Sequence, residues 1–237
     1  MIIDNTIIAY AEASGTIYNI PDSVTTIGNG AFYSCDSLTS VNIPDSVTTI
    51  GNLAFENCNN LTSVTIGNSV TTIGNYAFSG CTSLTSVNIP ESVTTIGEWA
   101  FAGCSKLKEF TGKYAADGGR CLIIDNTIIA YARASGTTYN IPDRVTTIGQ
   151  SAFYNCHSLT SVNIPDSVTT IGDYAFDGCI LKYVYCKPTT PPALGGSNVF
   201  GYNASGRRII VPIGSGEAYK TAEYWSEYAN DIFEDEF

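Results

Sequence analysis

Residues 38–60 read LTSVNIPDSVTTIGNLAFENCNN, and this 23-residue stretch recurs along most of the chain. Its central motif, IPDSVTTIGNGAF, starts at Ile20 and returns with small changes at Ile43, Ile66 and Ile89, and again at Ile141 and Ile164. The leucine of LTSV, the phenylalanine of AF and the cysteine after it keep the same spacing. A fixed period of this length indicates a solenoid, in which each unit stacks on its neighbours.

Each unit reads as one turn of the solenoid. In LTSVNIP the apolar residues Leu38, Val41 and Ile43 place their side chains on one face of a short strand. Pro44 ends this strand because it cannot donate to a sheet. SVTTIG is a second β-prone run, and we expect the AF segment up to the cysteine to form a short helical turn. The fold class predicted is an α/β or mainly-β solenoid, a right-handed superhelix of 23-residue units with parallel strands and a C-terminal cap.

A longer segment of the sequence, which includes the start of the repeat motif, also occurs twice. MIIDNTIIAYAEASGTIYNIPD from Met1 matches LIIDNTIIAYARASGTTYNIPD from Leu122. Two β-type runs flank Asp-Asn in this segment, which predicts a hairpin. We expect the repeat to cover residues 1–187, with hairpin-bearing units at 1–14 and 107–135. Met1 then begins partway through a unit, and we interpret the chain as a trimmed or fragmentary form.

The remaining residues, 188–237, read as a capping segment, because an open solenoid end exposes apolar side chains and an unpaired strand edge. Residues 209–211 predict a last strand that Pro212 ends. We expect Ser215 to be the N-cap of a helix and Trp225 and Tyr228 to pack over the last coil. The acidic run at 234–236 is expected to be a solvated or frayed end.

The pattern LxxVxIPxSVTTIGxxAFxxC, carried by Leu38 to Cys58, resembles the BspA-like class of leucine-rich repeats. That class occurs in surface and secreted proteins of host-associated bacteria and in some protozoa. The tail segments VYCKPTTPP and IIVPIGSGEAYKTAEYWSEY are similar to the end of such bacterial proteins. The resemblance implies adhesion or recognition at a cell surface, with host matrix proteins among the partners. It carries over no catalytic or binding residue, because the matching positions are core and turn positions.

Composition excludes several function classes. Eleven basic and 22 acidic residues leave a net charge of −11, and residues 1–105 contain no lysine or arginine, which argues against nucleic-acid binding. No apolar run is long enough to insert in a membrane. A single histidine, His157, leaves little basis for metal or histidine-base chemistry, and we expect no metal or cofactor. The start MIIDN lacks the features of a signal peptide, so an extracellular or cell-surface location rests on the resemblance.

Three sets of residues recur at equivalent positions of successive units, and we call each set a column. Each column has a structural and a functional interpretation. Six of the eight cysteines share one column, where parallel side chains favour buried thiols over disulfides or zinc. The Thr-Thr pairs satisfy β-propensity, with a hydroxyl ladder of the ice-binding kind as the alternative. The acid after the proline, as in Asp45, reads as a turn residue, with a stack of carboxylates that binds cations as the alternative.

Variable positions inside a strict repeat are the better guide to binding, because the scaffold does not dictate them. The residue before AF is the most variable of these: it is Gly30, Leu53, Tyr76, Trp99, Ser151 and Tyr174 in successive matching units. We predict that Leu53, Tyr76, Trp99 and Tyr174 form an outward apolar stripe suited to a protein or sugar partner. The alternative is that these side chains lie over neighbouring coils and stabilise the stack.

The function predicted from the sequence is a non-enzymatic module that binds a protein or a glycan. One alternative is a spacer that displays other domains of a longer protein. Another is a polysaccharide-active enzyme on a solenoid, which needs carboxylates and basic residues that converge outside the repeat. The one basic cluster available to such an enzyme is Lys106, Lys108, Lys113 and Arg120.

Overall fold

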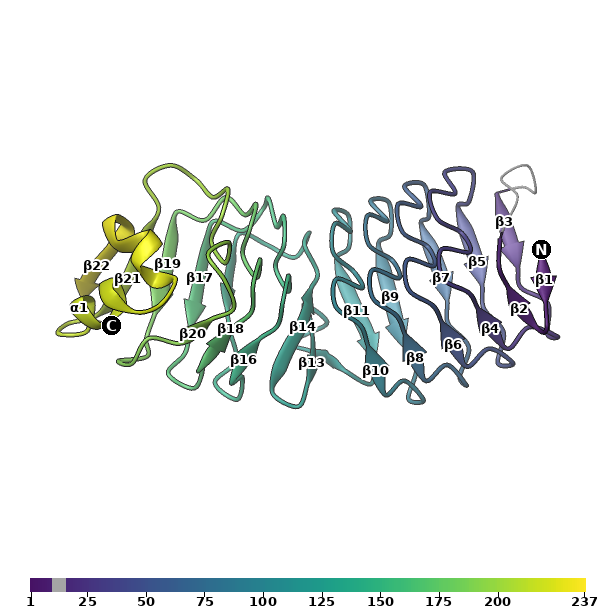
Figure 1. Ribbon diagram of the computed structural model, residues 1–237, viewed down its shortest axis with the longest axis horizontal. Coiled ribbons are helices and arrows are strands. Elements are labelled where there is room, and N and C mark those ends of the chain that lie inside the picture. Colours follow the sequence, from purple (N-terminus) through teal and green to yellow (C-terminus); the bar gives the residue numbers. More distant parts are fainter. Residues whose placement is uncertain (10–15) are drawn as a thin grey trace. The chain divides into compact units, whose positions relative to one another are not determined.

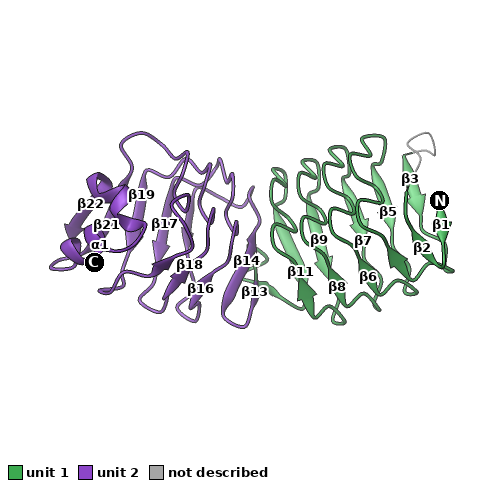
Figure 2. Ribbon diagram, viewed as in Figure 1, with its two compact units in different colours: residues 1–122 green, residues 123–237 purple. Residues whose placement is uncertain are grey.

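The computed structural model describes residues 1–9 and 16–237. They fall into two compact units, Met1–Leu122 and Ile123–Phe237 (Figure 2). Within each unit the chain winds in coils whose strands pair in parallel with those of the next coil (Figure 1). The predicted parallel-strand solenoid is therefore confirmed, and residues 10–14 of the first predicted hairpin unit lie outside the described residues.

Unit 1 carries two ladders of strands along its coils. The ladder of short strands consists of β1 (Ile2–Ile3), β2 (Thr6–Ile7), β4 (Thr26–Ile27), β6 (Thr49–Ile50), β8 (Thr72–Ile73) and β10 (Thr95–Ile96). The other side of each coil consists of β3 (Ile17–Asn19), β5 (Ser40–Asn42) and β7 (Ser63–Thr65), followed by the pair β9 (Ser86–Ile89) and β11 (Glu109–Gly112). The register places each residue beside its own copy, as Thr49 opposite Thr72 and Ile50 opposite Ile73.

Unit 2 repeats this arrangement. Its short strands are β14 (Thr127–Tyr131), β16 (Thr147–Ile148), β18 (Thr170–Ile171) and β20 (Ala193–Leu194). Its longer ladder is β15 (Thr138–Asn140), β17 (Ser161–Ile164), β19 (Tyr183–Cys186), β21 (Arg208–Pro212) and β22 (Ile232–Asp235). The α-helix α1 (Gly216–Thr221) and the 3₁₀ helix η2 (Trp225–Asp231) lie between β21 and β22.

The hairpins predicted around Asp-Asn are present. β1 pairs antiparallel with β2, and the turn residues Asp4 and Asn5 have φ of 47° and 59°. Two left-handed residues in succession define the turn that matches the twist of a two-residue hairpin, and Asp and Asn tolerate this conformation. Asp125 and Asn126 repeat it between β13 (Cys121–Ile124) and β14. In unit 1, β12 (Ala115–Ala116) also pairs antiparallel with β13, with Ala115 opposite Leu122.

The third side of each coil differs from the expected helical turn. Residues around AF form consecutive turns in which alternate N–H groups donate to the next coil. The N–H groups of Leu53, Phe55 and Asn57 each donate to a carbonyl 22 residues later, at 2.8 Å. Leu53 and Asn57 have φ of 60° and 59°, and these left-handed residues prevent a continuous right-handed helix. The third side is thus a further hydrogen-bonded ladder.

The core consists of identical side chains stacked from coil to coil. Ring centroids are separated by 4.7, 5.2 and 5.6 Å along Phe32, Phe55, Phe78 and Phe101. In unit 2 the separations are 4.8 and 5.4 Å along Phe153, Phe176 and Phe200. All of these rings are buried together with the repeated leucine, valine and isoleucine side chains. One coil alone buries little apolar surface, so the core exists only in the stack.

Glycine closes the second strand because the neighbouring coil passes close to its backbone. A Cβ atom at Gly74 would lie 2.6 Å from both the backbone nitrogen and the Oδ1 atom of Asn52. That asparagine side chain is fixed, because its Oδ1 accepts a hydrogen bond from the N–H of Asn75 at 2.9 Å. Asn29 makes the same bond to Asn52 at 2.8 Å. The repeated IGN triplet is therefore an asparagine ladder packed against glycines.

The capping segment ends the stack of unit 2. Trp225 and Tyr228 are buried, and their rings contact Phe200, the last ring of the phenylalanine column, as predicted. Asn203 Nδ2 donates to the carbonyl of Phe176 at 2.8 Å, where the preceding coils use a cysteine thiol. Arg207 donates to Asp231 at 2.6 Å and ties η2 to the last coil.

Two expectations for this segment are confirmed only in part. Ser215 lies at the N-cap position of α1, but its side chain makes no capping hydrogen bond. The first helical N–H, that of Gly216, instead donates to Glu234 Oε1 at 2.6 Å. Glu234 and Asp235 form part of β22, which pairs in parallel with β21, so the acidic run is an ordered strand with exposed side chains. Pairing with β21 orders this charged strand.

Replacing Gly74 by alanine should lower the free energy of unfolding by about 2–3 kcal/mol, because the new Cβ meets backbone that cannot retreat. Denaturant unfolding followed by circular dichroism measures the loss. Gly118→Ala is the control: its Cβ has no atom within 4 Å, so only its positive φ of 67° opposes the change, by about 1 kcal/mol. Equal losses in the two variants would show that close approach is not the reason for glycine at position 74.

Candidate binding surface

The predicted stripe occupies a position with an unusual backbone. Gly30, Leu53, Tyr76, Trp99, Ser151 and Tyr174 all have φ between 56° and 62°. At Leu53 and Tyr76 the N–H donates to the next coil, at 2.8 and 2.9 Å. Such a backbone suits glycine, while other residues are less stable there by roughly 1–2 kcal/mol. At this position the side chain therefore varies from coil to coil, whereas the backbone is held in the left-handed conformation.

Tyr76 and Trp99 are brought together by the coil spacing. Their ring centroids are 5.7 Å apart with planes at 14°, so the rings stack face to face. Both side chains are half-buried, and Leu53, on the coil before, is 37% exposed. Both interpretations of the stripe thus describe part of the geometry: the rings lie over neighbouring coils and keep one side exposed.

The stripe is confined to unit 1. Tyr174 lies in unit 2, where it is half-buried and where Ser151, at the same position of the preceding coil, is buried. Tyr174 therefore has no apolar neighbour at the equivalent position of that coil. Leu53, Tyr76 and Trp99 form the contiguous surface, which we name the aromatic stripe, and its role in binding stays a prediction.

A second left-handed position follows four residues later and was not predicted. It is occupied by Ser34, Asn57, Gly80, Gly103, Asn155 and Gly178, with φ between 53° and 77°. Asparagine and glycine are the residues that adopt this conformation most readily. Their alternation before the cysteine was the available signal. The left-handed backbone of the aromatic stripe could not be predicted in this way, because leucine, tyrosine and tryptophan do not favour the left-handed conformation.

The polar columns are largely occupied by contacts between coils. The first threonine of each pair is exposed, as expected, and its hydroxyl donates to the preceding coil, as from Thr48 to the Thr25 carbonyl at 3.3 Å. Asp45 Oδ1 accepts from the N–H of Asn68 at 2.6 Å, so this acid stabilises the turn of the next coil. Within residues 1–9 and 16–237, no group of three or more His, Cys, Asp or Glu residues is placed to hold a metal ion.

The comparison with known families agrees with this architecture. The pattern of the BspA type leucine-rich repeat region matches residues 6–115 and 125–214, in six copies. This chain belongs to the BspA-type leucine-rich repeat family. The resemblance predicted from the repeat is thereby confirmed. No curated protein matches the chain.

Solved bacterial structures share the fold of this BspA-type chain. A leucine-rich repeat protein from Bacteroides ovatus is 25% identical, with a TM-score of 0.51 over 82% of this chain and 63% of that one. The chain therefore spans less than two thirds of that protein. A leucine-rich repeat protein from Eubacterium ventriosum is 22% identical, with a TM-score of 0.54 over 89% of this chain and 72% of that one. The pneumococcal vaccine antigen PcpA is 16% identical, with a TM-score of 0.55 over 94% and 80%.

The cysteine column of this BspA-type chain consists of buried free thiols, as predicted. Four of these thiols, those of Cys58, Cys81, Cys104 and Cys179, donate to the carbonyl of the phenylalanine in the preceding coil, as from Cys58 to Phe32 at 3.0 Å and from Cys81 to Phe55 at 3.1 Å. Burial raises the pKa of Cys58 to about 12 and also raises that of Cys81 well above its ordinary value. Cys121 and Cys186, outside the column, are also buried and free. The thiols therefore act as small core residues that also hydrogen-bond.

No helix in the described part of the chain has the length and apolar character needed to cross a membrane.

The native thiols should not react with Ellman's reagent at pH 8, because the thiolate is the nucleophile and burial disfavours it. All eight should react once guanidinium unfolds the chain. His157→Cys, at an exposed position beside Cys156, is the control and should add one thiol that reacts in the native state. Rapid labelling of the native wild-type chain would contradict this account of the column.

The same burial predicts a pH dependence of stability. The pKa of Cys58 is raised from 9.0 to about 12 in the folded state, so the folded chain holds its proton more tightly than the unfolded chain. This contribution to stability is complete below pH 9 and is lost as the pH rises toward 12. The measurement is the denaturant midpoint of wild-type and Cys58→Ala chains across this range, and the difference between the two should shrink as the pH rises. A difference independent of pH would contradict the burial of this thiol.

Proposed function

We propose that this chain is a non-enzymatic binding module of a cell-surface or secreted protein, and that the aromatic stripe contacts a protein or glycan, such as a host matrix component. One observation carries the proposal: Leu53, Tyr76 and Trp99 keep exposed apolar surface on a backbone that favours glycine. Gly30 occupies the same position and makes the same hydrogen bond, so the fold does not require a bulky residue there. Strained backbone retained at a surface position supports a role in function.

The chemistry of the stripe suits recognition. Stacked tyrosine and tryptophan rings offer a large rigid surface, which loses little conformational entropy on binding and is enriched at interaction hot spots. The stripe lies in the part of the chain that has no lysine or arginine before Lys106. A neutral or basic partner surface is therefore favoured over a polyanion.

The enzyme alternative finds little support in the basic cluster at the end of unit 1. Lys113 Nζ donates to the Val93 carbonyl at 2.9 Å, and Arg120 forms an ion pair with Asp117 at 2.8 Å. These two side chains stabilise the last coil of unit 1. Membership of a leucine-rich repeat family is compatible with a module that binds without catalysis.

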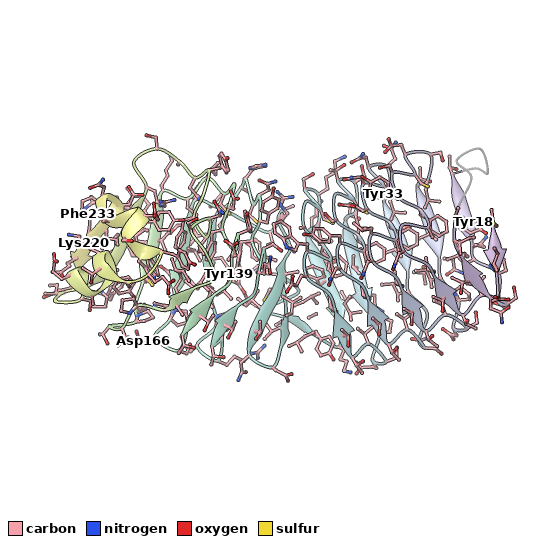
Figure 3. The ribbon with its side chains drawn as sticks, viewed as in Figure 1. Tyr18, Tyr33, Tyr139, Asp166, Lys220 and Phe233 are labelled. Carbon is pink, nitrogen blue, oxygen red and sulfur yellow. The ribbon has the colours of Figure 1, made fainter. Side chains whose placement is uncertain are left out.

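Tyr76→Ala and Trp99→Ala should each weaken binding to the partner by about tenfold or more, since buried aromatic anchors contribute most of the affinity of an interface. The measurement is biolayer interferometry of the whole chain against immobilised matrix proteins and glycans, with thermal unfolding to verify the fold. Tyr33→Ala is the matched control, because this tyrosine is 53% exposed in unit 1 and lies outside the stripe (Figure 3).

Unchanged affinity in both stripe variants would refute the stripe as the binding surface. A wild-type chain that binds no member of the panel would instead favour the spacer, and breakdown of a glycan would favour the enzyme. Either of these outcomes contradicts the proposed function.

A further inference from the structure

Unit 2 contains a groove beside the point where its coils become irregular. The largest of three adjoining hollows, about 840 Å³, lies between the Asp166 turn and the segment 187–193 that joins β19 to β20. Two smaller hollows of about 400 and 220 Å³ adjoin it and share Lys187 with it. Together they run from Asn140 and Asn163 past Asp166, which Figure 3 places on the rim of this unit, to Phe237. The largest hollow alone falls in the range typical of ligand sites, about 300–1,000 Å³.

The wall of the groove is rigid before any ligand arrives. Segment 187–193 contains Pro188, Pro191 and Pro192, whose rings restrict the backbone. Two buried aromatic residues of the cap anchor it: Tyr219 OH donates to the Pro188 carbonyl and Trp225 Nε1 to the Pro192 carbonyl, each at 2.7 Å. A prearranged wall reduces the entropy lost on binding.

The polar groups of the groove differ from those of the repeated columns. Elsewhere threonine hydroxyls bond between coils, as Thr94 donates to the Thr71 carbonyl at 3.2 Å. In the described part of the chain, the side chains of Asp166, Lys187, Thr189 and Thr190 make no hydrogen bond or ion pair. The groove thus offers a carboxylate, an ammonium group and two hydroxyls to a ligand.

Aromatic rings continue the groove at one end. Phe237 lines the largest hollow and is 55% exposed. Its ring stands perpendicular to that of Tyr185, with centroids 6.5 Å apart, and Tyr183 stacks beside Tyr185 at 6.2 Å. Exposed rings of this kind present apolar faces that pack against the C–H face of a sugar ring.

The backbone of the groove is poorly suited to a peptide. Its three prolines have no N–H, and the carbonyls of Pro188 and Pro192 already accept from the cap. The N–H groups of Lys187 and Ala193 are bonded to the preceding coil, at 3.0 and 2.8 Å. A peptide main chain needs such groups to pair with, whereas a ligand rich in hydroxyls can use the side chains.

We propose that this groove is a binding site for a neutral oligosaccharide. Hydroxyl groups of the sugar donate to Asp166 and accept from Lys187, while the ring faces pack on Phe237 and Tyr185. Asp143 and Asp166 flank the single ammonium group of Lys187, so the groove has excess negative charge and disfavours anionic glycans. The inference rests on the proposed function in that the chain is a binding module, but its site is separate in sequence and chemistry from the aromatic stripe.

The test is an array of neutral oligosaccharides of hexose and N-acetylhexosamine units, printed beside sulfated and sialylated glycans and proline-rich peptides, and probed with the full chain. Asp166→Asn and Lys187→Ala should each weaken binding to the best neutral glycan by about tenfold, the usual effect of losing a hydrogen bond to a charged group. Asp22→Asn, at the equivalent turn in unit 1, and Lys182→Ala, at the other end of β19, are the matched controls and should bind like wild type.

Retention of neutral glycans together with loss in the two groove variants supports the site. The site is refuted if the groove variants bind like wild type, if no neutral glycan is retained, or if sulfated glycans or peptides bind instead. The stripe variants Tyr76→Ala and Trp99→Ala separate the two proposals. Glycan binding that depends on the stripe alone refutes the groove and upholds the proposed function, whereas a chain that binds neither this array nor the panel of matrix proteins refutes both.

Discussion

The fold depends on how closely one coil can approach the next. At the fixed positions of the repeat, every coil places a residue beside its own copy, so a side chain is tolerated there only if it packs against itself at this spacing. The constraint explains why flat phenylalanine rings stack at about 5 Å. It explains the glycine at position 74, which lies against the backbone of Asn52. It also explains why asparagine amides, threonine hydroxyls and cysteine thiols recur: each reaches one backbone group of an adjacent coil.

Much of this architecture could be predicted from the sequence, because the repeat period indicates which residues lie side by side in adjacent coils. The strands, the buried cysteines and the Asp-Asn hairpins were predictable in this way. The left-handed backbone at Tyr76 and Trp99 was not, because neither residue favours that conformation. At Tyr76 the constraint comes from the hydrogen bond of its N–H to the next coil. The position of the stripe could be read as variable, but its strain and its stacked rings required the coil geometry.

The irregular end of the chain shows the limit of periodic reasoning. Residues 234–236 read as a solvated tail, yet β22 forms because β21 offers an unpaired edge and Gly216 offers an N–H to Glu234. The groove around Lys187 likewise depends on a departure from the repeat. A segment rich in proline replaces the ordinary turn there, and two aromatic residues more than thirty positions later anchor it through Pro188 and Pro192. The repeat period of the sequence gives no indication of such contacts.

The thiol column has a consequence for how this chain reaches its native state. The six cysteines of the column are buried only after neighbouring coils have stacked, and until then each is an ordinary exposed thiol. Solenoids fold by local nucleation that spreads from coil to coil. In an oxidising medium, propagation of the stack therefore competes with random disulfide formation between unstacked coils. The yield of native chain therefore depends on the rate of coil stacking relative to the rate of disulfide formation. Each coil of the column that stacks buries one more thiol and so protects it from oxidation.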